Sequence, residues 1–249
     1  MYIATAISRE KNYLEVLEKG LDFHSINALN AFEEKMVDMP KDLTREQKLD
    51  FIKENYGATW RYYAKALGFS LLYGASENGL SHTLNTSKKE AKSIIDMFLG
   101  ANKGIKSYID DTKKFVHEHG YVENHWGLRV YLPECINYNP FKNNIKKDYK
   151  AIGNYRFAVN TRIQSANAFL LYEGLIKLDE EITKRNLKVN ILTTIYDAVY
   201  FEIHKDEDQK AFAKLLREVF EVKFLDVDMK IDVAMSDDDT WYSWENIKL

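Results

Sequence analysis

The sequence predicts an α+β protein whose N-terminal part is mainly helical and whose C-terminal part combines helices with antiparallel strands. In the first half, apolar residues recur at helical spacing, and capping residues precede several of these runs. At 121–132 and again at 188–203, the pattern changes to short runs rich in β-branched and aromatic residues. Only three prolines and eleven glycines occur among 249 residues, so we expect two lobes without a flexible linker.

The helices of the first half have recognisable ends. Capping boxes at Thr44-x-x-Gln47 and Ser87-x-x-Glu90 mark two helix starts, because their side chains satisfy free backbone N–H groups. Glycines mark several helix ends, because glycine adopts the backbone conformation that stops a helix. The expected helices cover 8–19, 44–56, 59–73, 87–99 and 105–118.

Strands enter the expected fold at Tyr121–Asn124 and Leu128–Leu132, which are predicted to form a hairpin through His125-Trp126-Gly127. Residues 133–150 are expected to be irregular, with prolines and several asparagines. The remaining expected elements are a long helix over 152–185, two β-rich runs within 188–203 that meet at Asp197, an amphipathic helix over 206–221 and a strand from Val227 to Met235.

Composition excludes a uniformly basic nucleic-acid-binding protein, because the formal net charge is −3. A protein that binds phosphates through a local basic stripe is compatible with this net charge. The single cysteine, Cys135, has no partner for an internal disulfide and is expected to be a half-buried small residue. No signal-peptide pattern and no apolar run of ~18 residues occur, so a cytoplasmic protein without a membrane partner is expected.

Two rows of side chains at four-residue spacing are candidates for ligand binding. Arg61, Lys65, Phe69 and Tyr73 would lie along one helix face, where cations suit a polyphosphate and rings suit a base or sugar. The alternative is an ordinary amphipathic helix with both aromatic residues in the core. Arg156, Asn160 and Gln164 form the second row, which either follows a DNA minor groove or is a solvated polar face.

Asp197 is the one acid within the apolar run ILTTIYDAVYFEI before its closing Glu202. A carboxylate between two buried strands must be paired, protonated or metal-bound, because an isolated buried charge is too costly. Turn chemistry is the alternative, because aspartate favours hairpin turns. One carboxylate is a poor Mg²⁺ site by itself, so a second would have to come from elsewhere.

In this order, the segments resemble family A (polymerase I-like) DNA polymerases nearly from end to end, with an apparent insertion around 35–55. WRYYAKALGFSLLYGAS is similar to motif B of that family, and GLDFHSINA is similar to its D-x-H segment. GYVENHWGLRVYLP resembles the family's G-Y-V-E-T-x-x-G-R-R-R-x-x-P hairpin, and RFAVNTRIQSANA resembles its R-x3-N-x3-Q-G-x-A helix. DDTWYSWE is similar to the family's terminal E-x-W segment.

The resemblance implies a role for each matching residue in a right-hand polymerase fold. Its expected domains are an entry segment at 1–30, helical fingers at 31–140, and the C-terminal part of the palm, with its antiparallel sheet and helices, at 141–249. The implied nucleotide-binding residues are Arg61, Lys65 (also catalytic), His24, Phe69 and Tyr73. The implied DNA-binding residues are Gly74 at the templating base, Arg156, Asn160 and Gln164 in the primer–template minor groove, Tyr196 at the primer end, and Arg129.

Two departures from the family pattern shape the functional expectation. Motif C is Tyr196-Asp197-Ala198 rather than H-D-E. Motif A, which carries the other metal-binding aspartate, has no counterpart, because MYIATAIS aligns with the segment just after that motif. We therefore expect a phage-type split DNA polymerase, inactive alone, in a bacterial or phage-infected cell. A second polypeptide would supply the thumb and motif A, and two Mg²⁺ ions would be shared between its carboxylate and Asp197. The alternative is a non-catalytic DNA- or nucleotide-binding remnant that modulates another polymerase.

Overall fold

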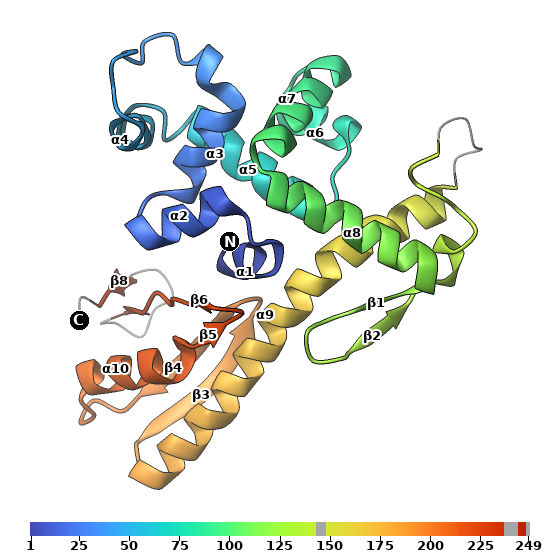
Figure 1. The fold of residues 1–249 in the computed structure, drawn as a ribbon. Coiled ribbons are helices and arrows are strands. Elements are labelled where there is room, and N and C mark those ends of the chain that lie inside the picture. The colour runs from blue at the N-terminus through green and yellow to red at the C-terminus, as the bar shows by residue number, and fades with distance from the viewer. Residues whose placement is uncertain (143–147, 237–243, 248–249) are drawn as a thin grey trace. The chain divides into compact units, whose positions relative to one another are not determined.

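A computed structural model describes residues 1–142, 148–236 and 244–247 and divides the chain into two compact units (Figure 1). Apart from Met1 and Tyr2, unit 1 comprises Ile3–Ile163 and unit 2 comprises Gln164–Leu249. The division falls inside one continuous helix, α9 (Tyr149–Arg185). The expectation of two lobes without a linker is therefore confirmed.

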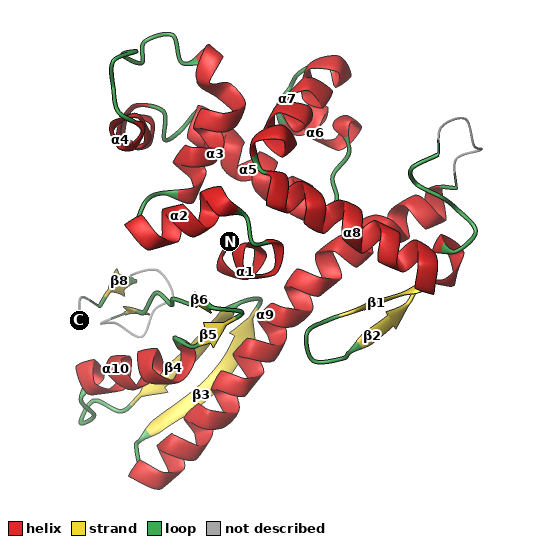
Figure 2. Cartoon of the chain, in the orientation of Figure 1, coloured by secondary structure: helices red, strands yellow, loops and turns green. Residues whose placement is uncertain are grey.

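Unit 1 is mainly helical, as Figure 2 shows. Its elements, besides the first part of α9, are α1 (Tyr2–Ser8), α2 (Lys11–Lys19), α3 (Phe23–Phe32), the 3-10 turn η1 (Glu33–Lys35), α4 (Arg45–Asn55), α5 (Trp60–Leu72), α6 (Glu77–Thr83), α7 (Lys88–Ala101), α8 (Lys103–His119), the antiparallel strands β1 (Tyr121–Glu123) and β2 (Arg129–Tyr131), and the 3-10 turn η2 (Pro133–Cys135).

The core of unit 1 is built around α3, which packs closely on α5. Ile26, Ala28 and Phe32 of α3 are buried together with Ala64 and Leu67 of α5. This burial removes apolar side chains from water on both helices, which stabilises their packing. The sides of α3 and α5 that remain outside the core are therefore held close to each other.

A buried polar contact joins α2 to α3, and a glycine lets α5 approach α3 closely. The hydroxyl of Tyr13 donates a hydrogen bond of 2.8 Å to Oδ1 of Asn27. A Cβ atom at Gly68 would lie 3.2 Å from Nδ2 of Asn27, so this glycine permits the close approach of the two helices.

A smaller core lies beneath the β1–β2 hairpin. Val116 of α8, Val122 of β1 and Tyr155 of α9 are buried there together with Cys135. Cys135 is fully buried rather than half-buried, so that expectation was wrong. Burial raises the pKa of its thiol to about 11, so the residue is a packed small side chain and not a reactive thiol.

Unit 2 packs the C-terminal part of α9 and one amphipathic helix around a hairpin. Its further elements are β3 (Val189–Ile195), β4 (Ala198–Ile203), α10 (Gln209–Phe220), β5 (Lys223–Phe224), β6 (Val227–Asp228), β7 (Ala234–Met235) and β8 (Glu245–Asn246). The strands pair antiparallel as β3–β4, β5–β6 and β7–β8. Leu178 of α9, Val189 of β3 and Leu216 of α10 are buried in the core of this unit.

Three helix expectations need correction. The helix expected over 8–19 begins only at Lys11 (α2), because Ser8 ends α1, Arg9 adopts a left-handed conformation (φ 53°) and Glu10 caps α2. Helices α3 and α6 were not expected. The amphipathic helix expected over 206–221 begins at Gln209, where the carboxylate of Asp208 accepts backbone hydrogen bonds from the first turn.

The strand expected from Val227 to Met235 was also wrong. Val227 and Met229 are buried and Asp228 is exposed, so the side chains alternate as the sequence indicates. However, ladder pairing among the described residues is confined to β6 at its start and β7 at its end. Alternation reports burial, whereas a strand also needs a partner for its backbone groups. Residues 237–243, which include most of the terminal DDTWYSWE segment, lie outside the described residues.

Candidate nucleotide and nucleic-acid site

The row Arg61, Lys65, Phe69 and Tyr73 lies on the outer side of α5. The buried residues of this helix are Ala64, Leu67, Gly68, Leu71 and Leu72, none of which belongs to the row. Tyr73 is 51% exposed and Phe69 is only partly buried, so the alternative with both rings in the core is wrong. Their ring centroids lie 6.5 Å apart at an interplanar angle of 28°, so two stacked rings continue the line of the two cations.

Asp22 holds the first cation of this row. It caps α3 by accepting a hydrogen bond of 2.7 Å from the backbone N–H of Ser25. Nε and Nη2 of Arg61 each donate to one oxygen of the same carboxylate at 2.8 Å. Burial alone would raise the pKa of Asp22, but the hydrogen bonds from Arg61 and Ser25 outweigh it and lower the pKa to about 2.

This bidentate pair fixes the direction of the guanidinium while three of its five N–H donors remain outside the pair. Asp22 was not predicted as a site residue, although it is the aspartate of the D-x-H segment. Its role depends on α3 packing beside α5, which the sequence alone did not reveal.

His24 lies beside the same row. Its ring centroid is 5.9 Å from that of Phe69. Burial is the main cause that lowers the pKa of His24 to about 4, and the positive charges of Arg61 and Lys65 add to this effect against the opposing charge of Asp22. The imidazole is therefore neutral at pH 7.

One nitrogen of this imidazole has an unmet bonding requirement. Within the described part of the chain, Nδ1 of His24 is buried and has no hydrogen-bond partner. Such an atom costs free energy until a ligand or water satisfies it. Its place beside two cations makes it a candidate for contact with a polar ligand.

Gly74, which follows the end of α5, packs directly against α9. Its φ of +74° is left-handed, which L-residues rarely adopt, and it lies just beyond the end of the helix. A Cβ atom at this position would lie 2.5 Å from Cβ of Arg156 and 2.8 Å from its Cα. The structure thus brings two predicted residues from distant parts of the sequence, Gly74 and Arg156, into direct contact.

The second row occupies the middle of α9. Arg156 is exposed and Asn160 is partly exposed, and both belong to unit 1. Gln164 lies one turn later on the same helix and is exposed, as the first α9 residue assigned to unit 2. The polar face expected from the sequence is present, and its donors and acceptors can reach a ligand from solvent.

Arg129 lies on the β1–β2 hairpin. Its guanidinium pairs with Glu123 opposite it on the neighbouring strand. Its Cζ atom also lies 4.7 Å from the ring centroid of Tyr121, which is a cation–π contact. The guanidinium is therefore oriented by two neighbours while its side chain remains half exposed.

Asp197 occupies the turn of the β3–β4 hairpin. Ile195 pairs with Ala198, so Tyr196 and Asp197 form a two-residue loop in which Tyr196 has a φ of 56°. The turn is open to solvent, with Tyr196 95% exposed and Asp197 exposed. The expectation that Asp197 lies between buried strands was wrong, and the turn alternative describes its position.

The described residues do not complete a magnesium site around this carboxylate. Among residues 1–142, 148–236 and 244–247, no group of three or more histidine, cysteine, aspartate or glutamate side chains is placed to hold a metal ion. Asp197 thus supplies one oxygen-donor side chain, and a complete set of ligands would require groups from another segment.

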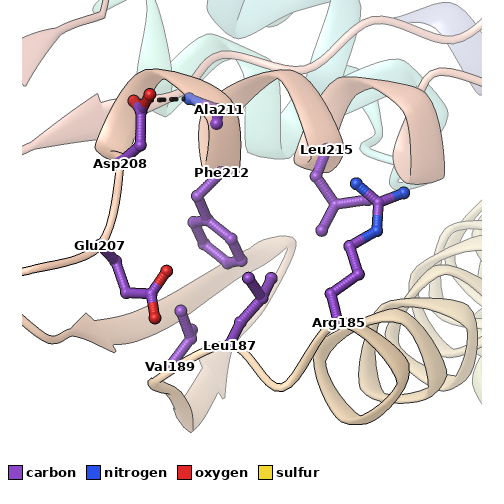
Figure 3. A pocket seen from close by; sticks show the side chains of 8 residues that line it. All are labelled: Arg185, Leu187, Val189, Glu207, Asp208, Ala211, Phe212 and Leu215. Carbon is purple, nitrogen blue, oxygen red and sulfur yellow. Dashed lines mark hydrogen bonds between the residues drawn. The ribbon is translucent and has the colours of Figure 1, made fainter.

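Unit 2 has a separate depression, whose lining residues pack in the core of the unit or form hydrogen bonds within it (Figure 3). Its apolar wall includes Leu187, Val189 and Phe212. At its rim Nε of Arg185 donates to Glu181 at 2.6 Å, and Glu207 accepts from the backbone N–H of Lys188 at 2.8 Å. The depression contains no residue of either predicted row.

No helix among the described residues is both long and apolar enough to cross a membrane.

The known proteins that this chain resembles in sequence are DNA polymerases. A family model described as DNA polymerase family A matches residues 1–243. DNA polymerase I of Bacillus subtilis (strain 168) is 30% identical over 237 residues, which cover 95% of this chain and 24% of the relative. DNA polymerase I of Streptococcus pneumoniae serotype 4 (strain ATCC BAA-334 / TIGR4) is 29% identical over 236 residues, with the same two coverages. The chain thus spans about a quarter of the length of these curated relatives.

A solved structure agrees with these sequence matches. The POL domain of Pol1 from M. smegmatis, in complex with DNA primer-template and dNTP, superposes with a TM-score of 0.76 at 27% sequence identity. The match covers 92% of this chain and 36% of that one.

Proposed function

Because the chain belongs to DNA polymerase family A, we propose that it forms the fingers and the C-terminal part of the palm of a template-directed DNA polymerase. Its fold is part of the right-hand polymerase fold, since it matches a polymerase domain over 92% of its length. In this proposal residues 1–30 are the entry segment, 31–140 the fingers and 141–249 the palm portion. Its place of action is the cytoplasm of a bacterial or phage-infected cell.

The outer row of α5 binds the incoming nucleotide. Arg61 and Lys65 contact the triphosphate, because Asp22 leaves three Arg61 donors available and Lys65 is exposed at the surface. Lys65 also stabilises the charge that develops during phosphoryl transfer. His24 contacts the same phosphates, which gives its buried nitrogen a partner. Phe69 packs against the sugar.

The predicted DNA-binding residues contact the primer–template. Tyr73 and Gly74 shape the position of the templating base, and the contact of Gly74 with Arg156 links that position to α9. Arg156, Asn160 and Gln164 contact the minor groove, where purine N3 and pyrimidine O2 accept hydrogen bonds in every base pair. Arg129 contacts DNA from the hairpin, and Tyr196 contacts the primer end.

Asp197 contributes one carboxylate to the divalent metal site that the family uses. Two Mg²⁺ ions held between two carboxylates would neutralise charge on the reacting phosphate. The second carboxylate comes from a further segment, expected on a second polypeptide together with the thumb. Exposed Leu192 and Ile195 support this proposal, because the described residues of the β3–β4 sheet form two strands only, and an open edge beside apolar residues is suited to strand addition.

The observation that carries the proposal is the convergence of two cations, two stacked rings and a neutral histidine beside α5, in contact through Gly74 with Arg156. These groups match a nucleotide and an adjoining nucleic acid in charge and shape. The isolated position of Asp197 favours a second candidate, a protein that binds DNA and nucleotide without catalysis.

The two candidates are separated by recovering the tagged chain from the cell that makes it and assaying primer extension. We expect extension by the recovered complex, its loss in Asp197→Ala, and negligible extension by the purified chain alone. The matched control is Asp206→Ala, which removes another exposed aspartate of unit 2 and should retain activity. Extension that is indifferent to Asp197 would refute the proposed role of this residue. Nucleotide and DNA binding without extension in any fraction would establish the second candidate.

A further inference from the structure

The outward face of the β1–β2 hairpin carries a connected group of aromatic rings, for which the proposed function gives no role. We call Phe115, His119, Tyr121 and Tyr131 the hairpin aromatic cluster. Phe115 and His119 come from the last turns of α8, and the two tyrosines come from β1 and β2. All four belong to unit 1, as do the nucleotide-site residues of α5 and α3.

Tyr121 lies at the centre of this cluster. Its ring centroid is 5.3 Å from Phe115, 5.9 Å from His119 and 5.9 Å from Tyr131. Phe115 and His119 stack on each other at 4.2 Å with an interplanar angle of 15°. The Arg129 guanidinium lies over the Tyr121 ring. The arrangement is a set of rings with a cation at its side.

The hairpin has two faces of opposite character. Val122 points into the buried core, and Val130, its cross-strand neighbour, packs against that core. The other face pairs Tyr121 with Tyr131 across the strands. Burial of the valine face already anchors the hairpin to unit 1. The tyrosine side chains on the other face are therefore not needed to hold the hairpin in place. Tyr131 nevertheless remains 71% exposed and Phe115 lies at the surface.

Exposed rings beside a guanidinium suit the flat faces of unpaired bases. Stacking of this kind tolerates any sequence, because every base has a π-face. A paired duplex offers its phosphates and groove edges instead, and its bases stack on one another. The cluster therefore fits a single strand better than a double strand.

We propose that the hairpin aromatic cluster is a stacking site for unpaired bases of the template strand before they reach the templating position. The template as the source of these bases rests on the proposed polymerase function. Tyr131 and Phe115 provide the ring faces, Tyr121 contacts both rings, and Arg129 contributes positive charge beside the strand.

The test measures binding of the full chain to primer–templates that share one duplex but differ in the template overhang. One overhang has about one nucleotide and the other about twelve, because single-stranded sites span roughly 4–16 nucleotides. Fluorescence anisotropy gives the affinity, and 2-aminopurine placed along the long overhang reports stacking. A free single-stranded oligonucleotide is measured in parallel.

We expect Tyr131→Leu to weaken binding of the long-overhang substrate and of the free strand roughly tenfold. Binding of the short-overhang substrate should stay unchanged. Tyr131→Trp should restore the affinity and the 2-aminopurine quenching, whereas leucine restores neither, because it has apolar bulk without a ring. The matched control is Tyr62→Leu, which removes a 60% exposed tyrosine of α5 outside the cluster.

Equal affinity of Tyr131→Leu and the unchanged protein for the long overhang would overturn the proposal. An equal loss on both overhangs would overturn it too, because it would indicate a general defect. Tyr131-dependent binding of the free strand, without any binding of primer–template, would keep the stacking site and reject the polymerase function instead. If the unchanged protein binds neither the long overhang nor the free strand, the stacking site is rejected.

Discussion

Replacing Asp22 by asparagine removes the carboxylate that Arg61 binds while leaving a side chain that still caps α3. Asparagine is as good an N-cap as aspartate, so the hydrogen bond from the Ser25 N–H should survive. The pKa of Asp22 lies near 2 instead of 3.8, and one pKa unit corresponds to about 1.4 kcal/mol. The full shift therefore corresponds to about 2 kcal/mol of stabilisation by all its partners.

The part that belongs to the ion pair is smaller, because the cap contributes to the shift and both side chains are about a quarter exposed (25% and 22%). We expect a coupling free energy between Asp22 and Arg61 of about 1–2 kcal/mol. The assay is a double-mutant cycle of Asp22→Asn, Arg61→Gln and the double variant, with urea unfolding at pH 7 followed by circular dichroism. A coupling below about 0.3 kcal/mol would refute the inference that this pair fixes the guanidinium.

The sign of the pH dependence gives an internal control for this cycle. The folded pKa of Asp22 is lowered, so its contribution to stability is present above about pH 4 and is lost as the pH falls toward 2. Asp22→Asn has no carboxyl group to titrate at this position and should lack this loss. An equal acid dependence in both proteins would assign the loss to other carboxylates.

Three further predictions concern the same unit. Gly74→Ala should lower the free energy of unfolding by about 2–4 kcal/mol, because its φ is +74° and its Cβ would collide with Arg156. Wild type should lose about 2–3 kcal/mol relative to His24→Gln as the pH falls from 7 to 4, since the folded pKa of about 4 lies below the usual 6.5 and disfavours the charged form. Glu10→Ala should cost about 2–3 kcal/mol, because this buried carboxylate caps both α2 and α8, whereas exposed Glu18→Ala should be nearly neutral. Urea unfolding measures all three, and a Gly74→Ala protein as stable as wild type would contradict the packing inferred at that position.

Local signals in the sequence predicted the helices that carry their own start and stop residues. The capping box at Thr44 is present, with both reciprocal hydrogen bonds, and Ser87 caps α7. The break at Arg9 had no such signal, because it depends on Glu10 reaching the first turn of α8, 94 residues later in the chain. Helix α3 was missed because much of its surface is buried, so no single apolar stripe distinguishes it.

The residues of the candidate site show the same contrast between local signals and tertiary contacts. Four-residue spacing correctly placed Arg61, Lys65, Phe69 and Tyr73 in one row, since helical geometry alone determines that relation. Asp22 was missed because its partner lies 39 residues away and only tertiary packing joins the two. Spacing also could not decide whether the rings of the row face solvent or the core.

The error at Asp197 has a different cause, and it bears on the proposed partner. The sequence of β3 and β4 is apolar and β-branched, which is typical of strands buried on both faces. Within the described residues one side of this hairpin meets a core, through Val189 and its neighbours, while Leu192 and Ile195 are exposed. A sequence suited to burial that lies exposed supports the proposal that another segment covers this surface. A strand added at this hairpin would bury those residues beside Asp197, where a carboxylate on that strand would complete the oxygen ligands that the described residues lack.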